Sequence, residues 1–442
     1  MALVPWIRIG QPLENVLDDY ERILDAWDAG GIRGLVFGRL VFADGKGGFT
    51  VPAFRPDPEP FRRRGLELAP AAAGPDAARE KQLHAMLDDV KRRGWPVLVF
   101  CPGQSTHSVS APPGEDPFGA LNHAAVWEDV FTAFPQADGG VMDGWAELPY
   151  EFGAVFRGLT AADRRRAEAT GHDADRLDEG RRQLMEAFSR LTPGRVRYYG
   201  HHGMLSAMNL FDLREDGVHW LRWRREASLA EGRAFRAELD RLPRKLLLGN
   251  GLRTAMFTGI TGIDYAAWDG ILDLMLVKHY FWQRGFDGLY GTITRWVEKV
   301  KELNPGLTEA DCFTVVRAWF GTDLPEVESR ADMDHGFPQA FFDETVAEET
   351  RRALAAASRP EKVLPWVDTG RMPHRGDPMT AGDLKRILEA SEGAGLRRFL
   401  FHNHGHLTAA EWKVISRMCG REWDEDPDGY WPPNSPPKEV FR

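Results

Sequence analysis

A cluster of carboxylates and aromatic rings follows a short apolar run in the first half of the chain. The run 139–142 ends at Asp143, and Trp145, Glu147 and Tyr150 come directly after it. A short apolar segment bounded by glycine is typical of a buried strand, so these side chains would lie at a strand exit. Carboxyl groups beside an indole ring could protonate a leaving group and hold a sugar ring against an aromatic face. The pattern favours a functional site, and a polar loop that caps a sheet is the alternative.

The chemistry of glycoside hydrolysis suggests a role for each carboxyl group. The reaction needs one protonated and one ionised carboxyl on either side of the scissile bond. We expect Glu147 to be the general acid, because the apolar faces of Trp145 and Tyr150 would favour its protonated form. Asp143 or Asp368 would then act as nucleophile or base. An ion pair with Arg or Lys inside the fold is the alternative for Asp143.

Strand-like and helix-like patterns alternate along the whole chain. Apolar runs predict strands at 34–42, 95–101, 139–143, 196–199, 245–250, 272–280, 362–368 and 398–404. Amphipathic stretches predict helices at 13–29, 77–93, 122–134, 160–191, 217–241, 264–270, 288–357, 380–394 and 408–418, with a loop near 321–338. About eight strands, each followed by a helix, are the pattern of a closed (β/α)₈ TIM barrel. An open doubly wound sheet is the alternative, although no GxGxxG follows the first predicted strand.

The chain is predicted to form one α/β domain over residues 1–442. No long flexible linker divides it, and the glycine- and proline-rich stretch 43–75 predicts a long loop. The proline-rich tail 423–442 predicts an irregular surface strap.

Polar and aromatic side chains stand at nearly every predicted strand exit, where a barrel carries its chemistry. Adjacent residues of a strand face opposite sides, so only one of Lys278 and His279 can enter the pocket. Lys278 could pair with a catalytic carboxylate, and a structural ion pair is the alternative. Arg253 and Arg371 could bind an acidic sugar through paired hydrogen bonds. The candidate substrate-binding residues are Trp145, Trp282 and Trp366 as stacking platforms, and Asn250, Lys278, His279, His402 and His404 as polar contacts.

Three segments carry a family resemblance. They are the DGWAE motif at 143–147, the KHYFW and GFDGLYG motifs within 278–291, and the FHNHG motif at 401–405. On these motifs the chain resembles a family of hypothetical (β/α)₈-barrel glycoside hydrolases related to the retaining-glycosidase clan. The resemblance covers most of the chain and implies hydrolysis of O-glycosidic bonds in an oligo- or polysaccharide by paired carboxylates, without a cofactor. The chain departs from that clan in lacking an Asn-Glu dipeptide and in ending the 362–368 strand with Asp368 rather than a glutamate.

Histidines support a second hypothesis. His402, His404 and His406 alternate, so all three would face one way on a continuing strand. With His201, His202 or an aspartate they could bind a divalent metal and form a metal-dependent hydrolase or lyase. A non-catalytic carbohydrate-binding barrel is the third hypothesis.

Composition excludes other classes of function. The net charge of −10 argues against a nucleic-acid partner, which would need clustered Lys and Arg. The three cysteines form no CxxC pair, so neither a disulfide framework nor a thiolate zinc site is expected. No apolar run approaches about 18 residues and no signal peptide is visible, so we expect no membrane span and a cytoplasmic protein. Secretion stays possible if a signal has been removed, and no oligomeric state is predicted.

Overall fold

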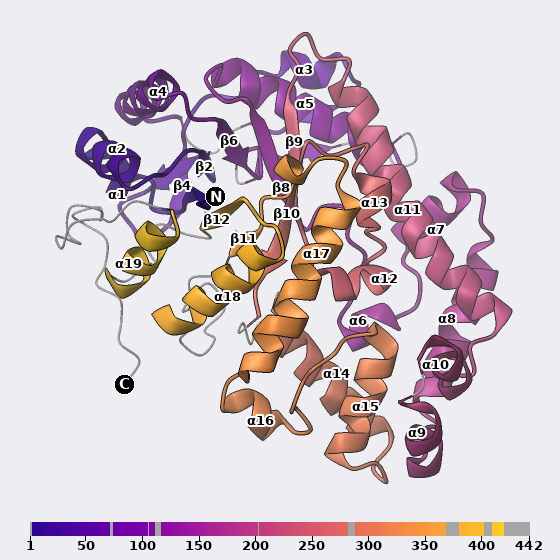
Figure 1. The fold of residues 1–442 in the computed structure, drawn as a ribbon. Coiled ribbons are helices and arrows are strands. Elements are labelled where there is room, and N and C mark those ends of the chain that lie inside the picture. The colour runs from indigo at the N-terminus through magenta and orange to yellow at the C-terminus, as the bar shows by residue number, and fades with distance from the viewer. Residues whose placement is uncertain are drawn as a thin grey trace.

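The computed structural model describes residues 2–70, 74–104, 106–110, 116–201, 203–281, 288–367, 380–401 and 409–419. Eight parallel strands close into a barrel in the order β1-β12-β11-β10-β9-β8-β6-β2 (Figure 1). The predicted (β/α)₈ barrel is therefore confirmed. The barrel strands are β1 (Val4–Ile9), β2 (Leu35–Phe37), β6 (Val97–Phe100), β8 (Gly139–Asp143), β9 (Leu247–Leu252), β10 (Leu274–His279), β11 (Trp366–Val367) and β12 (Arg398–Phe401).

One predicted strand, 196–199, is wrong. Those residues belong to helix α9 (Pro193–Tyr199), where Pro193 stands in the first turn and the Thr192 hydroxyl accepts a hydrogen bond from the backbone N–H of Arg195 at 3.3 Å. These local helix-start signals override the strand propensity of a β-branched residue and two tyrosines. Val196 is buried and Tyr198 is 69% exposed, so the segment packs through one side of a helix.

The eighth strand is instead β1, at the beginning of the chain, which the sequence analysis did not identify. It pairs in parallel with β12 on one side and β2 on the other, and so closes the barrel. The predicted strand 34–42 is also shorter than expected, because β2 ends at Phe37. The residues after it enter β3 (Val41–Ala43), which pairs with β4 (Phe49–Pro52) in a separate two-stranded sheet.

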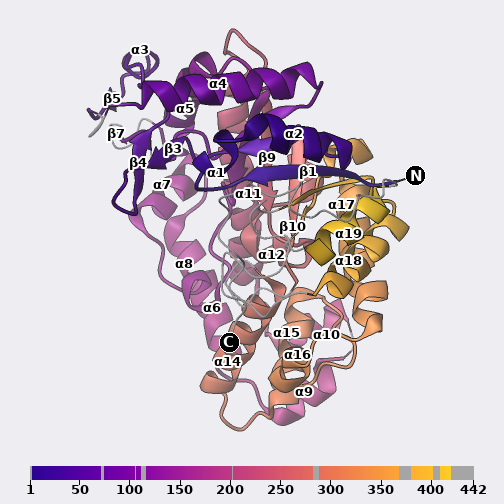
Figure 2. The same ribbon diagram turned by 90° about the vertical axis from the view of Figure 1, so that its left-hand side faces the viewer.

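Helices surround the barrel and occupy most of the predicted helical stretches (Figures 1 and 2). A second short sheet pairs β5 (Glu67–Leu68) with β7 (Val109–Ser110). No helix within the described ranges is long and apolar enough to cross a membrane. The remaining helices are α1 (Glu14–Leu17), α2 (Tyr20–Ala29), α3 (Glu59–Arg62), α4 (Ala77–Arg92), α5 (Ala120–Ala133), α6 (Phe152–Val155), α7 (Ala161–Ala169), α8 (Ala174–Phe188), α10 (Met204–Leu210), α11 (Glu215–Leu239), α12 (Thr258–Thr261), α13 (Tyr265–Trp268), α14 (Leu289–Leu303), α15 (Glu309–Phe320), α16 (Arg330–Asp334), α17 (Ala347–Ala356), α18 (Ala381–Gly393) and α19 (Ala409–Met418), with short 3₁₀ and π turns η1 (Ala255–Phe257), η2 (Phe341–Val346) and η3 (Pro360–Lys362).

The connection from β8 to β9 is the longest between consecutive strands of the barrel. It carries α6 to α11, and α8 packs along α11. Figure 1 shows α7 to α11 together on one side of the molecule, beside the barrel. The loop that leaves β8 is therefore held between the barrel mouth and a thick layer of helices.

Two sets of buried side chains form the core. One lies between the strands and the helices, and the other fills the barrel. Alternation along each strand sorts residues between the two sets. Members of the inner set include Trp6 on β1, Val141 on β8 and Leu276 on β10. Two residues further along each of these strands, on the same face, stands a charged residue: Arg8, Asp143 and Lys278. The carboxyl ends of the strands therefore place charged groups above an apolar barrel interior.

Candidate active site at the barrel mouth

An ion pair joins two strands at the carboxyl end of the barrel. Asp143 is the last residue of β8, and Lys278 lies near the end of β10. The Lys278 ammonium Nζ lies 2.7 Å from Asp143 Oδ1. The Lys278 side chain is 2% exposed, whereas that of Asp143 is 32% exposed. The pair is therefore anchored in the barrel on the lysine side and accessible on the carboxylate side.

A glycine on the intervening strand makes this pairing possible. β9 lies between β8 and β10, and Gly251 pairs in register with Asp143 on one side and Leu276 on the other. A Cβ at Gly251 would lie 2.9 Å from Asp143 Oδ1 and 3.2 Å from Cζ3 of Trp366. The first contact is closer than a side-chain carbon tolerates, and the second is tighter than most. The absence of a side chain at Gly251 lets Asp143 and Lys278 meet across β9.

The charges around Asp143 keep its carboxyl ionised. Burial raises the pKa of this group, but the Lys278 ammonium and the guanidinium groups of Arg253 and Arg8 outweigh burial and lower the pKa below its usual value. Burial likewise lowers the pKa of Lys278, and the charge of Asp143 opposes that effect. Asp143 is thus poised to act as a nucleophile, a base or an electrostatic partner in its charged form.

Aromatic rings form the floor below the ion pair. Trp366 on β11 is fully buried in the inner set and meets Phe100 edge to face, with ring centroids 5.4 Å apart. The Arg8 guanidinium carbon lies 3.7 Å from the centroid of the Phe100 ring and 5.4 Å from that of Trp366. Cation–π contacts of this kind hold a guanidinium group in a partly desolvated site. Trp366 therefore forms part of the barrel floor, and its predicted use as a stacking platform stays a prediction.

Glu147 makes a second, closed ion pair. Its Oε2 accepts a hydrogen bond from Arg253 Nε at 2.9 Å, and its Oε1 accepts one from the Arg253 backbone N–H at 2.8 Å. The two side chains are 4% and 7% exposed. The Arg253 guanidinium carbon also lies 4.6 Å from the centroid of the Tyr150 ring. Both oxygens of the Glu147 carboxylate accept hydrogen bonds from one buried arginine, so this geometry does not favour the predicted role of Glu147 as general acid.

Two further candidates, Asn250 and Trp145, fix the loop after β8 to β9 and to the surrounding helices. Asn250 on β9 is fully buried; its Oδ1 accepts a hydrogen bond from the backbone N–H of Trp145 at 3.2 Å, and its Nδ2 donates one to the Trp145 carbonyl at 2.9 Å. The Trp145 indole packs edge to face against Phe235 of α11 and Trp268 of α13. Asn250 thus positions the loop, and Trp145 anchors it in the helical layer. Their predicted contacts with substrate stay predictions that this geometry does not favour.

Lys278 and His279 face opposite ways. Lys278 enters the barrel, and His279 lies fully buried on the helical side, with its ring centroid 5.5 Å from that of Phe281. Neither ring nitrogen of His279 has a hydrogen-bond partner among the described residues. Burial lowers the pKa of His279 to about 4, so the ring is neutral at ordinary pH. The predicted contact of His279 with substrate is not favoured by this placement.

Several candidates fall outside the residues that the structure describes. Within the described ranges, no group of three or more His, Cys, Asp or Glu side chains is arranged to hold a metal ion. The candidates outside those ranges are Asp368, Trp282, His402 and His404, together with Arg371, His202 and His406 of the alternative hypotheses and the tail 423–442.

Sequence reasoning missed Arg8, Gly251 and the surroundings of Cys101. Trp6 and Arg8 alternate with the buried Ile7 and Ile9, which is the pattern of a barrel strand with a charged inward residue, and this signal could have identified β1. Burial, with a further contribution from the charge of Asp143, raises the pKa of the Cys101 thiol to about 12. The Cys101 thiol is therefore neutral, and Cys101 is not a candidate nucleophile.

The chain therefore forms a closed (β/α)₈ barrel that carries an ionised carboxylate at its mouth and an aromatic floor below it. No protein-family model and no curated protein matches the chain.

Solved structures similar to the chain include three glycoside hydrolases. The glycoside hydrolase domain of PgaB (BpsB) from Bordetella bronchiseptica is 11% identical over 94% of this chain and 99% of that chain, with a TM-score of 0.46. A β-galactosidase from the psychrophilic Marinomonas ef1 is 10% identical over 95% of this chain and 59% of that chain, with a TM-score of 0.45. The catalytic domain of β-amylase from Paenibacillus polymyxa is 12% identical over 98% and 99% of the two chains, with a TM-score of 0.43. At these identities and scores, no residue role is carried over from them.

Proposed function

We propose that the protein is a glycoside hydrolase that cleaves O-glycosidic bonds of an oligo- or polysaccharide and uses Asp143 as its ionised carboxylate. The observation that carries this proposal is the ion pair of Asp143 with Lys278 at the barrel mouth. It combines a charged carboxyl group, access to solvent and a position at the carboxyl end of a barrel strand.

The geometry supports a division of labour within the pair. The Lys278 side chain is buried, so it holds the carboxylate in place and favours its charged form. The exposed side of Asp143 is free to approach the anomeric carbon, or a water molecule next to it. As a nucleophile, Asp143 forms a bond to the anomeric carbon while the bond from that carbon to the leaving oxygen breaks; as a base, it takes a proton from the attacking water.

A second carboxyl group must donate a proton to the leaving oxygen. Both carboxylate oxygens of Glu147 accept hydrogen bonds from Arg253, so we propose Asp368 for this role. Asp368 directly follows β11 in the sequence, and β11 lies three strands from β8 around the barrel. Carboxyl groups on separate strands can bracket a substrate between them.

A non-catalytic carbohydrate-binding barrel is the second candidate function. It is favoured by the closed pair of Glu147 with Arg253, which removes one of the carboxyl groups that hydrolysis would use. Such a protein would bind a sugar at the mouth through Asp143 and Lys278 without cleaving it.

Hydrolysis assays separate the two candidates. The wild-type protein and Asp143→Asn are tested on a panel of aryl-glycosides and oligosaccharides, with binding to the same oligosaccharides measured by calorimetry. We expect wild-type hydrolysis, and a fall in kcat/KM of about 10³-fold or more in Asp143→Asn. Asp175→Asn is the matched control, because that carboxylate is 87% exposed on α8.

The outcomes are distinct. Oligosaccharide binding without turnover would favour the binding barrel. Hydrolysis that is insensitive to Asp143→Asn and is removed by a chelator would transfer the activity to a metal site and contradict the proposal.

A further inference from the structure

A cavity of about 750 Å³ lies outside the barrel, among α10, α11, α12 and α15. Small-molecule sites in proteins have volumes of about 300–1,000 Å³. The residues at the barrel mouth, Asp143 and Lys278 among them, are not part of its lining. It is therefore separate from the site to which we assign hydrolysis.

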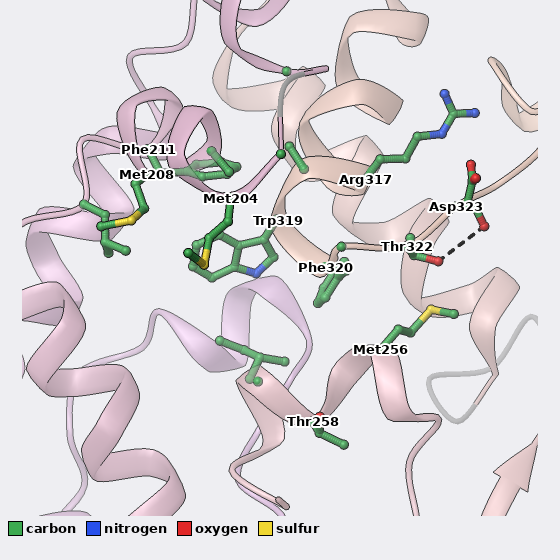
Figure 3. Close-up of a pocket in the computed structure, with 18 of the residues that line it drawn as sticks. Met204, Met208, Phe211, Met256, Thr258, Arg317, Trp319, Phe320, Thr322 and Asp323 are labelled. Carbon is green, nitrogen blue, oxygen red and sulfur yellow. Dashed lines mark hydrogen bonds between the residues drawn. The ribbon is translucent and has the colours of Figure 1, made fainter. Parts of the chain in front are cut away.

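One end of this cavity is apolar. Figure 3 shows Met204 next to the indole of Trp319, with Met208 and Phe211 beyond it and Phe320 below. Met204 is 75% exposed, and Met208 is 37% exposed. Exposed apolar side chains around a concave site indicate a binding surface for an apolar group. Unbranched methionines adapt to the shape of such a ligand.

The polar groups in the wall do not suit a sugar. The Thr258 hydroxyl already donates to the Ala255 carbonyl at 2.7 Å, and the Thr322 hydroxyl donates to the Asp323 carbonyl at 3.4 Å (Figure 3). The lining also contains His201, Arg317, Asp323 and Arg352, and the Arg317 guanidinium already donates to the carbonyls of Leu324 and Val327. A sugar needs a set of hydrogen-bonding partners for its own hydroxyls, whereas the end of the cavity near Met204 offers methionine, phenylalanine and tryptophan side chains.

The other end of the cleft is cationic. A second cavity of about 510 Å³ continues from the first, and it is lined by Arg222, Arg225 and Arg352. Arg225 pairs with Asp264 at 2.5 Å, and Arg352 pairs with Glu349 at 3.0 Å. Arg222 has no ion-pair partner among the residues that the structure describes, which leaves a positive excess. The two cavities share Leu221, Ala255, Thr258, Gly259 and Arg352 in their linings.

We propose that this continuous cleft binds an amphiphile with an apolar chain and an anionic head, a carboxylate or a phosphate. The chain would lie against Met204, Met208 and Trp319, where burial of apolar surface drives association. The head would lie at the arginines, whose guanidinium groups match the geometry of both anions. The proposal does not depend on the hydrolase activity.

The test is a fluorescence titration with dansyl-labelled undecanoic acid as the probe. We expect saturable binding of one probe per chain. The methyl ester of the same probe lacks the negative charge and should bind about tenfold more weakly. Competition by unlabelled dodecanoate and by dodecyl phosphate distinguishes the two head groups.

Variants locate the bound probe. Gly259 lies where the two cavities meet, and a Cβ there meets no atom within 4 Å, so Gly259→Phe should fill the cleft without a clash. We expect it to weaken binding by about tenfold or more. Gly306→Phe is the matched control, since it is also an open glycine and does not line the cleft. Arg222→Gln should weaken binding of the acid by about threefold and leave the ester unaffected.

The proposal would be overturned if the probe showed no saturable binding, or if Gly259→Phe and wild type bound it with equal affinity. Equal affinity for the acid and the ester would also overturn it. So would binding only to phosphatidylglycerol vesicles, which would make the exposed methionines a membrane contact. If Gly259→Phe does not fold, as judged by circular dichroism, Arg222→Gln and Met204→Lys carry the same test, because both side chains are exposed.

Discussion

Two ion pairs lie at the carboxyl end of β8, and they differ in whether their carboxylate is accessible to a substrate. Asp143 pairs with Lys278 inside the barrel mouth and keeps 32% of its side chain exposed, whereas Glu147 pairs with Arg253 and keeps 4%. The two acids are four positions apart in the sequence. One carboxylate can reach a substrate, and the other joins the loop after β8 to the end of β9.

The difference shows that residue type and proximity in the sequence do not assign roles to acids. In the Asp143 pair the cation is buried and the carboxylate is partly exposed. Lys278 therefore lowers the pKa of a carboxyl group that a substrate can still reach. In the Glu147 pair both partners are buried, and both carboxylate oxygens are used by one residue. A pair buried on both sides positions the segments that carry it, because neither partner faces solvent.

The largest expected effect separates the two acids in activity. Asp143→Asn should lower kcat/KM by about 10³-fold, or about 4 kcal/mol of transition-state stabilisation, because the charged carboxylate is removed. Glu147→Gln should keep most of the activity per folded molecule. Steady-state kinetics on the best substrate of the panel measure both. An equal loss in Glu147→Gln at unchanged stability would restore Glu147 as the general acid.

The next effect separates the two pairs in stability. Arg253→Met leaves the buried Glu147 carboxylate without its partner and should cost about 3–5 kcal/mol in the free energy of unfolding, measured by urea denaturation. The double variant Glu147→Gln with Arg253→Met should lose less than the sum of the single variants, since no charge is left buried. Lys278→Met should lose less than Arg253→Met, because water reaches the Asp143 carboxylate that it leaves without a partner. The reverse order would contradict the comparison.

Gly251→Ala should disturb the open pair alone. The added Cβ would press on Asp143 Oδ1 and on the Trp366 ring, and a displaced carboxylate should lower kcat/KM by about 10²-fold. The Glu147 pair is not among the atoms that this Cβ meets. Gly306→Ala serves as the control, and unchanged kinetics in Gly251→Ala would show that the Asp143 geometry is not needed.

The smallest effect concerns pH. Lys278 lowers the pKa of Asp143, so Lys278→Met should raise that pKa. The ionised form would then be lost at a higher pH, and the acidic limb of kcat/KM should move upward relative to wild type. The same depressed pKa stabilises the fold above the unfolded carboxyl pKa of about 3.9, and this contribution disappears as pH falls through the folded value. A pH–rate profile with an unmoved acidic limb would contradict the pairing.

Much of the fold could be predicted because barrel strands carry strong local signals. The apolar runs at β8, β9 and β10 lie close to where the sequence places them, and alternation correctly separates Lys278 from His279. The strand prediction for 196–199 was wrong because the N-cap Thr192 and the first-turn Pro193 outweigh the strand propensity of that segment. The strand β1 was missed because six residues with a proline give a weak pattern, and its pairing with β12 and β2 supplies the missing stabilisation.

The sequence by itself determined the barrel, the placement of Asp143 at a strand exit and the opposite directions of Lys278 and His279. Each of these follows from local periodicity and from the strand order that the chain imposes. Tertiary structure alone decided the partners: Arg253 meets Glu147 across 106 residues, and Lys278 reaches Asp143 over a glycine of the strand between them. The physical reason is that the environment of a carboxylate depends on burial and neighbouring charge, which arise only when distant segments pack together.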